Sequence, residues 1–265
     1  MAVNREHWRG PLEALPPWLC PSCQVGSLFL DKTTFRCEST HASKAAKEDD
    51  NWEPDWTEER FVGLLRCQNP GCRDIVGIGG RTQYVENHEP EEGPQWLQAF
   101  EPQFIYPAPP VFQIPKRCPT SVAEELKSAF SLLWSDTKSC ANRLRAAAEV
   151  LLTDRKIPSK TLNKKKKMVR IDLHARIEKY KQKDPTSANY LLAIKWLGNV
   201  GSHTSLDKLG VDDLLNGFEL FEHVVQRIYE KHEEHLKKIA KTINARKGRP
   251  VKPKAWKPWK KKKTI

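Results

Sequence analysis

Long apolar segments are missing from this chain. Within its 265 residues, no uninterrupted apolar run approaches the roughly 20 residues that a helix needs to span a bilayer. The opening stretch MAVNREHWRG interrupts its apolar residues with charged ones and contains no apolar signal region, so we expect no export. These two absences predict a cytoplasmic protein that does not enter a membrane.

Several catalytic motifs are missing as well. The sequence has no Gly-rich phosphate loop, no metal–carboxylate cluster and no serine-nucleophile motif, which excludes the enzyme classes that those motifs define. The chain has seven cysteines, an odd number that cannot all pair in disulfides. Without an export signal, this number indicates reduced thiols or metal ligands and not disulfides. The missing motifs favour a protein that is not an enzyme.

Charge is distributed unevenly along the chain. The net charge is +12, but thirteen Lys and Arg residues and no acidic residue follow from position 237 to the end. Without those thirteen, 32 basic residues stand against 33 acidic ones. The basic character therefore belongs to the C-terminal tail, and such tails commonly bind nucleic acid or anionic membranes.

Two cysteine pairs, each in a Pro- or Gly-containing turn, are the main feature of residues 1–85. Cys20 and Cys23 enclose Pro-Ser, and Cys67 and Cys72 enclose Gln-Asn-Pro-Gly. Tetrahedral zinc accepts four thiolates at about 2.3 Å, and two such turns can bring the pairs together. We expect these four cysteines to bind one structural Zn²⁺ in a small β zinc-ribbon domain over 1–85. The alternative is a small β-module with unpaired buried cysteines.

The segment between the pairs contains two further potential ligands. Cys37 and His41 could replace one of the four cysteines, although a lone cysteine is more often a small buried hydrophobic residue. Residues 38–60 are polar, acidic and rich in tryptophan, and we interpret them as an insertion between strands. Trp52 and Trp56 in this insertion are expected to cover the small core or to form a partner surface.

The next two segments differ sharply in composition. Residues 86–119 are rich in proline, which excludes a continuous helix or a central strand and predicts an extended connector. Residues 120–240 carry apolar residues at helical spacing and predict about five helices in a bundle. Thr120 or Ser121 is expected to open the first of these helices with a capping box. The run Lys164–Lys167 is expected to be a solvated loop or a second phosphate contact.

A compact polar motif, Gly198-Asn199-Val200-Gly201-Ser202-His203, separates the last two helical patterns. Glycine after a periodic segment is typical of a helix C-cap, so we expect a helix, a tight polar loop and a long helix. Together with residues 141–145 and 173–177, this GN-x-x-x-H motif resembles the bacterial domain of unknown function 4145 family over roughly residues 119–230. The resemblance implies an all-helical, HEPN-like domain that often follows a zinc ribbon in defence or restriction systems.

The fold class predicted here is therefore α+β. A small β zinc-ribbon domain (1–85) and a Pro-rich connector (86–119) precede an all-α, HEPN-like bundle of about five helices (120–240). A disordered basic tail (241–265) completes the chain.

Asn199 and His203 are the two catalytic candidates, since histidine titrates near neutrality and an amide can orient it. The resemblance implies a relationship to HEPN ribonucleases, whose catalytic motif is Arg-x(4–6)-His. This chain departs from that pattern, because the basic residue before the motif is Lys195, with seven residues between it and His203. Asn199 and His203 can equally serve to fix the loop or to contact a ligand, so the residues alone identify no firm catalytic group.

The tail contains a second recognisable motif. Residues 246–250, RKGRP, resemble an AT-hook core, in which glycine permits close approach to the minor groove and proline stiffens an extended backbone. Tryptophans among the following lysines add stacking capacity. A solubilising tail and a membrane-surface contact are the alternatives. The expected nucleic-acid contacts are Arg246, Lys247, Gly248, Arg249, Pro250, Lys252, Lys254, Trp256, Lys257, Trp259 and Lys260.

These observations predict a non-catalytic, zinc-binding, nucleic-acid-associated protein of a bacterial defence or restriction system. The alternative is a metal-independent HEPN-type endoribonuclease. The expected partners are nucleic acid, DNA before RNA, and a protein of a defence complex, with homodimerisation through the bundle also open. No membrane partner is expected.

Overall fold

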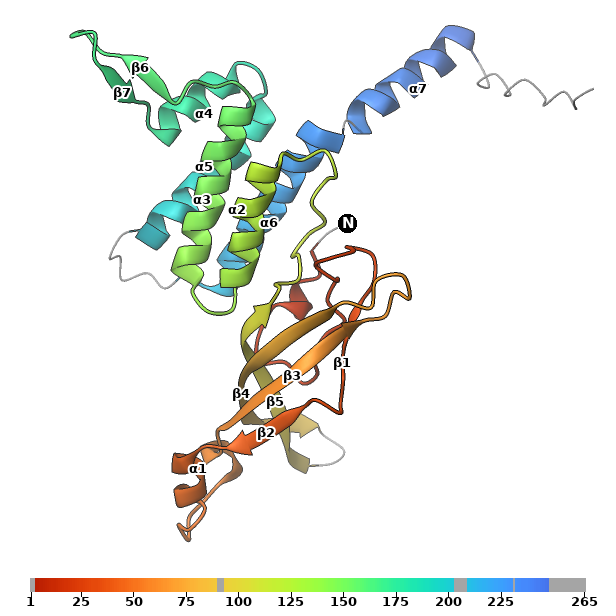
Figure 1. Cartoon of the computed structure of the whole chain (residues 1–265), viewed down its shortest axis with the longest axis vertical. Coiled ribbons are helices and arrows are strands. Elements are labelled where there is room, and N and C mark those ends of the chain that lie inside the picture. Colours follow the sequence, from red (N-terminus) through yellow and green to blue (C-terminus); the bar gives the residue numbers. More distant parts are fainter. Residues whose placement is uncertain (1–2, 90–92, 203–208, 231, 248–265) are drawn as a thin grey trace, which may run out of the picture.

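The computed structural model describes residues 3–89, 93–202, 209–230 and 232–247. An antiparallel sheet within residues 28–106 lies beside a bundle of helices that begins at residue 120 (Figure 1). Over the described residues, no helix combines the length and the apolar character needed to cross a membrane.

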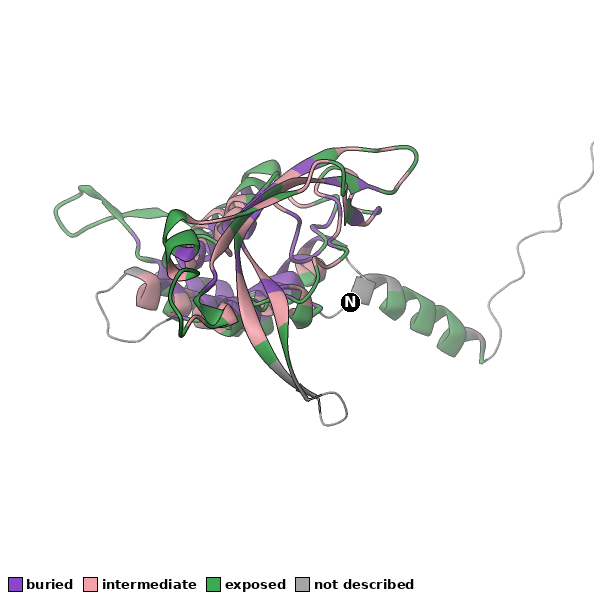
Figure 2. Ribbon diagram, turned by 90° about the horizontal axis from the view of Figure 1, so that it is seen from below, coloured by how far each residue is buried: buried purple, intermediate pink, exposed green. Residues whose placement is uncertain are grey.

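Five antiparallel strands form the sheet. β3 pairs with β4 along one side, and with both β1 and β2, one after the other, along its other side. β5 pairs with β4 and forms an edge. The sheet curls into a half-barrel (Figure 2). The strands are β1 (Leu28–Leu30), β2 (Arg36–Ser39), β3 (Glu59–Cys67), β4 (Ile75–Glu89) and β5 (Gly93–Tyr106).

This half-barrel corrects the predicted zinc ribbon. The two cysteine turns adjoin β1, β3 and β4, but β4 continues through residue 85, where the first domain was expected to end. β5 lies within the segment predicted as a connector. Proline excludes a central strand, but an edge strand has one side whose backbone needs no strand partner. The edge position of β5 therefore accommodates prolines that a central strand would exclude.

A register shift between Gly79 and Gly80 accommodates a proline in β5. Gly80 lies opposite Pro102, and a Cβ atom at Gly80 would stand 2.2 Å from the Glu101 carbonyl oxygen. It would also stand 2.8 Å from the Pro102 Cα. Only glycine permits this close backbone approach, and a bulge of this kind bends the strand and increases its twist.

The acidic insertion between β2 and β3 contains a short helix, α1 (His41–Ala46), and a 3-10 turn (Pro54–Trp56). The Ser43 side chain is buried, and its hydroxyl oxygen accepts from the Glu58 N–H and donates to the Glu58 carbonyl oxygen. Trp52 is half-buried, and the Trp56 side chain is 47% exposed. These hydrogen bonds attach the insertion to the start of β3.

The described residues contain seven α-helices, not the five predicted. The five expected helices are α2 to α6. α1 lies in the segment interpreted as an insertion, and α7 crosses residue 240, where the helical domain was expected to end and the tail to begin. A π-helical turn (Gln226–Glu230) separates α6 from α7. The helices after α1 are α2 (Thr120–Leu132), α3 (Thr137–Asp154), α4 (Leu173–Lys181), α5 (Pro185–Ser202), α6 (Val211–Val225) and α7 (His232–Arg246).

Aspartates cap three of these helices, including Asp184, which accepts from the Ser187 N–H at 3.2 Å at the start of α5. The Asp136 carboxylate accepts from the Ser139 N–H at 2.9 Å at the start of α3, and Asp172 accepts from the Ala175 N–H at 3.0 Å at the start of α4. The capping box expected at the start of α2 is wrong, because Pro119 occupies the N-cap position and provides no side-chain hydrogen bond.

The GN-x-x-x-H motif does not begin with a loop. α5 continues through it to Ser202, so the expected C-cap at Gly198 is wrong. A Cβ atom at Gly198 would stand 2.6 Å from the Arg145 Cβ, and one at Gly201 would stand 2.7 Å from the Lys138 carbonyl oxygen. Both contacts are with α3. The two glycines therefore allow α5 and α3 to pack closely, a tertiary role that cannot be distinguished from a cap by position alone.

The predicted loop between α3 and α4 contains a β-hairpin of β6 (Lys160–Leu162) and β7 (Met168–Arg170), which projects from the bundle (Figure 1). The Asn163 side-chain oxygen accepts the N–H groups of Lys165 and Lys167, both at 2.9 Å. These bonds give the lysine-rich tip a defined backbone.

The N-terminal segment connects the sheet to the bundle. Trp8, Trp18 and Trp134 form an aromatic cluster with ring centroids between 5.8 and 6.3 Å apart. The Arg5 guanidinium contacts the Glu219 carboxylate of α6 at 2.8 Å, and Arg9 contacts Asp212, also of α6, at 2.8 Å. Buried residues of both parts form one hydrophobic core.

Candidate metal centre

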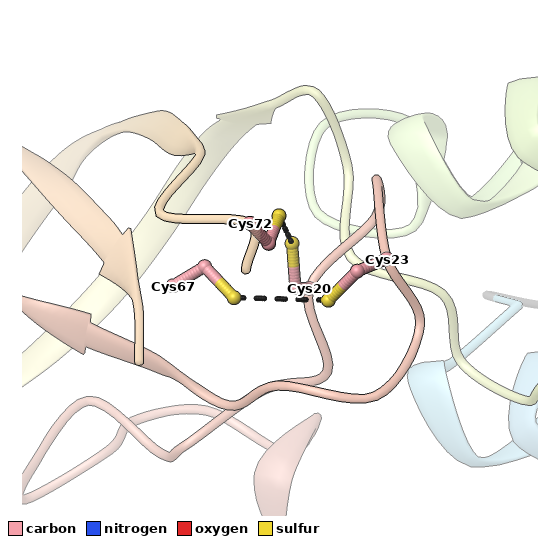
Figure 3. Close-up of side chains that lie close together, drawn as sticks. All are labelled: Cys20, Cys23, Cys67 and Cys72. Carbon is pink, nitrogen blue, oxygen red and sulfur yellow. Dashed lines mark hydrogen bonds between the residues drawn. The ribbon is translucent and has the colours of Figure 1, made fainter. Parts of the chain in front are cut away.

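The four predicted ligands converge at one point near the junction of the two parts (Figure 3). The sulfur atoms of Cys20 and Cys72 lie 3.9 Å apart, and those of Cys23 and Cys67 lie 3.7 Å apart. All four sulfurs lie within 4.8 Å of one another. A tetrahedron with metal–sulfur bonds of about 2.3 Å has sulfur–sulfur edges of about 3.8 Å. The cluster can therefore hold a metal ion.

Two turns position these side chains. In the first, the Cys20 N–H donates to the Gly26 carbonyl oxygen at 2.8 Å and the Gln24 N–H donates to the Cys20 carbonyl oxygen at 2.9 Å. In the second, the Cys67 N–H donates to the Asp74 carbonyl oxygen at 2.9 Å. Gln24 has φ 52° and Arg73, the residue after Cys72, has φ 51°. A residue with left-handed backbone conformation thus follows the second cysteine of each turn.

The local environment shifts the pKa values of the Cys23 and Cys67 thiols in opposite directions. The Gly26 N–H donates to the Cys23 sulfur at 3.3 Å and is the main reason that the pKa of this thiol falls to about 6. Burial raises the pKa of Cys67 to about 12. A bound metal ion would lower the pKa of both thiols, because its positive charge stabilises every thiolate that ligates it.

Three residues that the sequence analysis did not single out support the cluster. A Cβ atom at Gly26 would stand 2.5 Å from the Cys67 sulfur, so this position accepts only glycine without movement. The Ser22 hydroxyl donates to the Asp74 carboxylate and so joins the two turns. In the sequence, these three residues could be noticed only because they lie within or just after the cysteine turns. Their contacts depend on how the two turns meet in the folded chain.

The two alternative ligands lie elsewhere. The Cys37 thiol donates to the Glu59 carboxylate at 3.4 Å, and burial raises its pKa to about 11. His41 is the first residue of α1, and its side chain is exposed. The cluster is complete without either residue. Cys118 and Cys140 also lie outside it.

The other predicted site residues are only partly located. Asn199 is half-buried within α5, and His203 lies outside the described residues. The catalytic role of Asn199 and His203 stays a prediction.

Little of the predicted nucleic-acid tail is described. Arg246 is the last residue of α7, and Lys247 is an exposed turn residue with φ 47°. The remaining predicted contacts, from Gly248 to Lys260, lie outside the described residues. Their role in binding stays a prediction.

Comparison with known families defines two segments. Residues 11–108 match the family described as "Domain of unknown function (DUF8608)", and residues 127–246 match the "Domain of unknown function (DUF4145)" family. The second match confirms the resemblance drawn from the sequence for the helical part. No curated protein and no solved structure gives a significant match. The HEPN relationship and the defence setting stay predictions.

Proposed function

We propose that the four-cysteine cluster binds one Zn²⁺ in a structural role. A set of four thiolates with tetrahedral spacing suits zinc, and a four-thiolate shell leaves no coordination position for a substrate. Cys20 and Cys67 are buried, so the site is closed on their side. The ion would hold together two turns that are 44 or more residues apart in the chain.

We further propose that the protein binds nucleic acid without cleaving it, and that the β6–β7 hairpin contacts phosphates. The observation that carries this proposal is the charge of the projecting hairpin. Residues 160–170 are all exposed and include Lys160, four consecutive lysines and Arg170, with no acidic residue among them. Clustered cations on a projecting element suit a phosphate backbone, because each contact releases condensed counterions.

The hairpin has the rigidity that such a contact requires. Arg170 forms an ion pair with Glu149 of α3, and the Ile171 N–H donates to the Ser159 carbonyl oxygen at 2.9 Å across the base of the hairpin. The Asn163 bonds at the tip hold the lysine backbone in place. Because the hairpin is already ordered, binding costs less conformational entropy, and this favours affinity.

Exposed lysines of α7 extend the basic surface toward the C-terminus. Lys238 and Lys241 are exposed on this helix, which extends away from the rest of the structure (Figure 1). The tail that follows adds further cations. Hairpin and tail together would give two phosphate-binding elements on one chain, which raises the affinity for a long nucleic acid.

Replacing Lys164–Lys167 by glutamine should weaken binding to a duplex by about tenfold or more at moderate salt. The slope of log affinity against log salt should fall by about 0.9 for each lysine that contacts a phosphate. Fluorescence anisotropy with labelled A·T-rich and G·C-rich duplexes at several salt concentrations measures both quantities. Truncation after Ala245 should also reduce the slope, and an additive loss in the combined variant would assign contacts to each element.

The matched control replaces four exposed lysines elsewhere, Lys32, Lys44, Lys179 and Lys183, by glutamine. This variant has the same net charge as the hairpin variant. Equal losses in the two variants would show that binding depends on net charge alone and would refute a site on the hairpin. Absence of binding by the natural sequence at low salt would refute the function itself.

A further inference from the structure

The outer face of the sheet, which points away from the core, exposes large apolar side chains. These residues alternate with buried ones along their strands, as Phe104 and Tyr106 do on either side of the buried Ile105. The exposed fractions are 51% for Phe104 and 77% for Tyr106. The exposed apolar residues of this outer face are Phe29, Val62, Ile75, Phe104 and Tyr106.

Two glycines leave the middle of the outer face without side chains on β4. On β4, Gly77 pairs with Tyr106 and Gly79 pairs with Phe104. A Cβ atom at Gly79 would stand 2.5 Å from the Phe104 ring, so this ring lies over the glycine. Two aromatic side chains are thus presented about 7 Å apart along one strand, as expected for residues i and i+2.

Hollows adjoin both aromatic residues. One of about 610 Å³ is lined by Phe104, Arg60 and Arg81, and also by Glu58, whose carboxylate lies 3.8 Å from the Arg81 guanidinium. The other, of about 490 Å³, is lined by Tyr106, by Lys127 of α2 and by residues of the first cysteine turn. Each aromatic residue therefore has a cationic side chain at the hollow beside it.

The arginines of this face differ in their pairing. Arg81 contacts the Glu101 carboxylate at 2.6 Å, and Arg66 contacts Asp31 at 2.6 Å. Arg60 is exposed, and among the described residues no carboxylate lies within ion-pairing distance of it. Its charge is therefore available to an anionic ligand.

We propose that this face binds single-stranded nucleic acid, with bases stacked on Phe104 and Tyr106 and with phosphates contacted by Arg60 and Lys127. Exposed aromatic rings with cations beside them are the requirements for binding unpaired bases and their backbone. The bases of a duplex are stacked on each other and cannot reach these rings. The inference rests on the proposed nucleic-acid function and adds a second site with a preference for unpaired strands.

The first cysteine turn makes this site dependent on the metal. Pro21, Ser22 and Gln24 line the hollow beside Tyr106, and the turn that holds them includes two of the four cysteines. Loss of the ion should therefore reduce single-strand binding, even where hairpin and tail still hold a duplex.

The test compares Phe104→Ala/Tyr106→Ala with the natural sequence on a labelled twelve-nucleotide oligothymidylate and on a labelled duplex. Each stacked base is worth at least about 1 kcal/mol, so losing two should weaken oligothymidylate binding by about 30-fold or more. Duplex binding should stay within about threefold. The aromatic-preserving variant Phe104→Tyr/Tyr106→Phe should bind both probes like the natural sequence, which separates loss of stacking from loss of folding.

A control, Trp56→Ala/Trp196→Ala, removes two aromatic side chains that are 47% and 52% exposed on other surfaces. It should leave oligothymidylate binding unchanged. Arg60→Gln/Lys127→Gln should weaken that binding while leaving both rings in place.

The outcomes distinguish this inference from the function on which it rests. Oligothymidylate binding that is unchanged in Phe104→Ala/Tyr106→Ala but lost in the hairpin variant would overturn the stacking site and leave the proposed function standing. Failure of the natural sequence to bind either probe would reject both. Light scattering provides a further readout: conversion of a dimer to a monomer by the face variant would assign this surface to a second copy of the chain and overturn the inference.

Discussion

Removing the metal from the four-cysteine cluster should unfold the β half-barrel. Structural zinc is worth about 10–16 kcal/mol in finger peptides, comparable to the roughly 5–15 kcal/mol net stability of a whole domain. The purified protein should contain about one zinc per chain, and Cys67→Ser should contain almost none. Elemental analysis measures the metal, and thermal unfolding with and without a chelator measures its contribution to stability.

The control for this experiment is Cys37→Ser. Cys37 lies outside the cluster and donates to the Glu59 carboxylate, a contact that a serine hydroxyl can also make. This variant should keep its metal and its unfolding midpoint. An unchanged midpoint after complete metal removal would contradict a structural role, and a natural sequence that binds no metal would reject the site.

Alanine at the two glycines of α5 should destabilise the bundle despite the better helix propensity of alanine. Gly→Ala in an exposed helix position gains about 1 kcal/mol, whereas overpacking costs about 1–3 kcal/mol. In Gly198→Ala/Gly201→Ala, each new methyl group meets α3, at 2.6 Å and 2.7 Å respectively. Two overpacked sites cost about 2–6 kcal/mol and the propensity gain offsets at most about 2, so we expect a net loss of up to about 4 kcal/mol, measured as the free energy of unfolding in denaturant.

Gly217→Ala is the matched control in α6. Its Cβ atom would meet only the terminal methyl groups of Leu197 and Leu144, at 3.1 and 3.2 Å, and these can move slightly. We expect a change within about 1 kcal/mol. A gain in stability for the α5 double variant would show that the two glycines are not packing residues and would reopen the loop interpretation.

Much of the chain could be predicted where the signal is local. The periodicity of residues 211–229 indicates a helix, and α6 with its following turn occupies those positions. The two cysteine pairs indicated a metal site, and their sulfurs do converge. In both cases the pattern lies within a few residues, and the physical constraint acts at the same range.

The errors occurred where a residue type has two structural uses. Proline excluded a central strand from residues 86–119, but β5 is an edge strand, and its Pro102 lies at a bulge. Glycine suggested a cap at Gly198, but the glycine serves a helix contact. The alternation that presents Phe104 and Tyr106 was present in the sequence, but the proline content of the segment led to a different interpretation.

The sequence by itself determined the four cysteines of the candidate metal site, the core faces of the main helices and the basic character of the C-terminus, because spacing and composition carry that information. Only the tertiary structure decided that β4 and β5 complete a half-barrel and that α5 approaches α3 through Gly198 and Gly201. It also decided that the lysine run projects on a hairpin. These features depend on strand pairing and helix contact between residues distant in sequence, and local patterns do not specify which distant partner a strand or a helix face will meet.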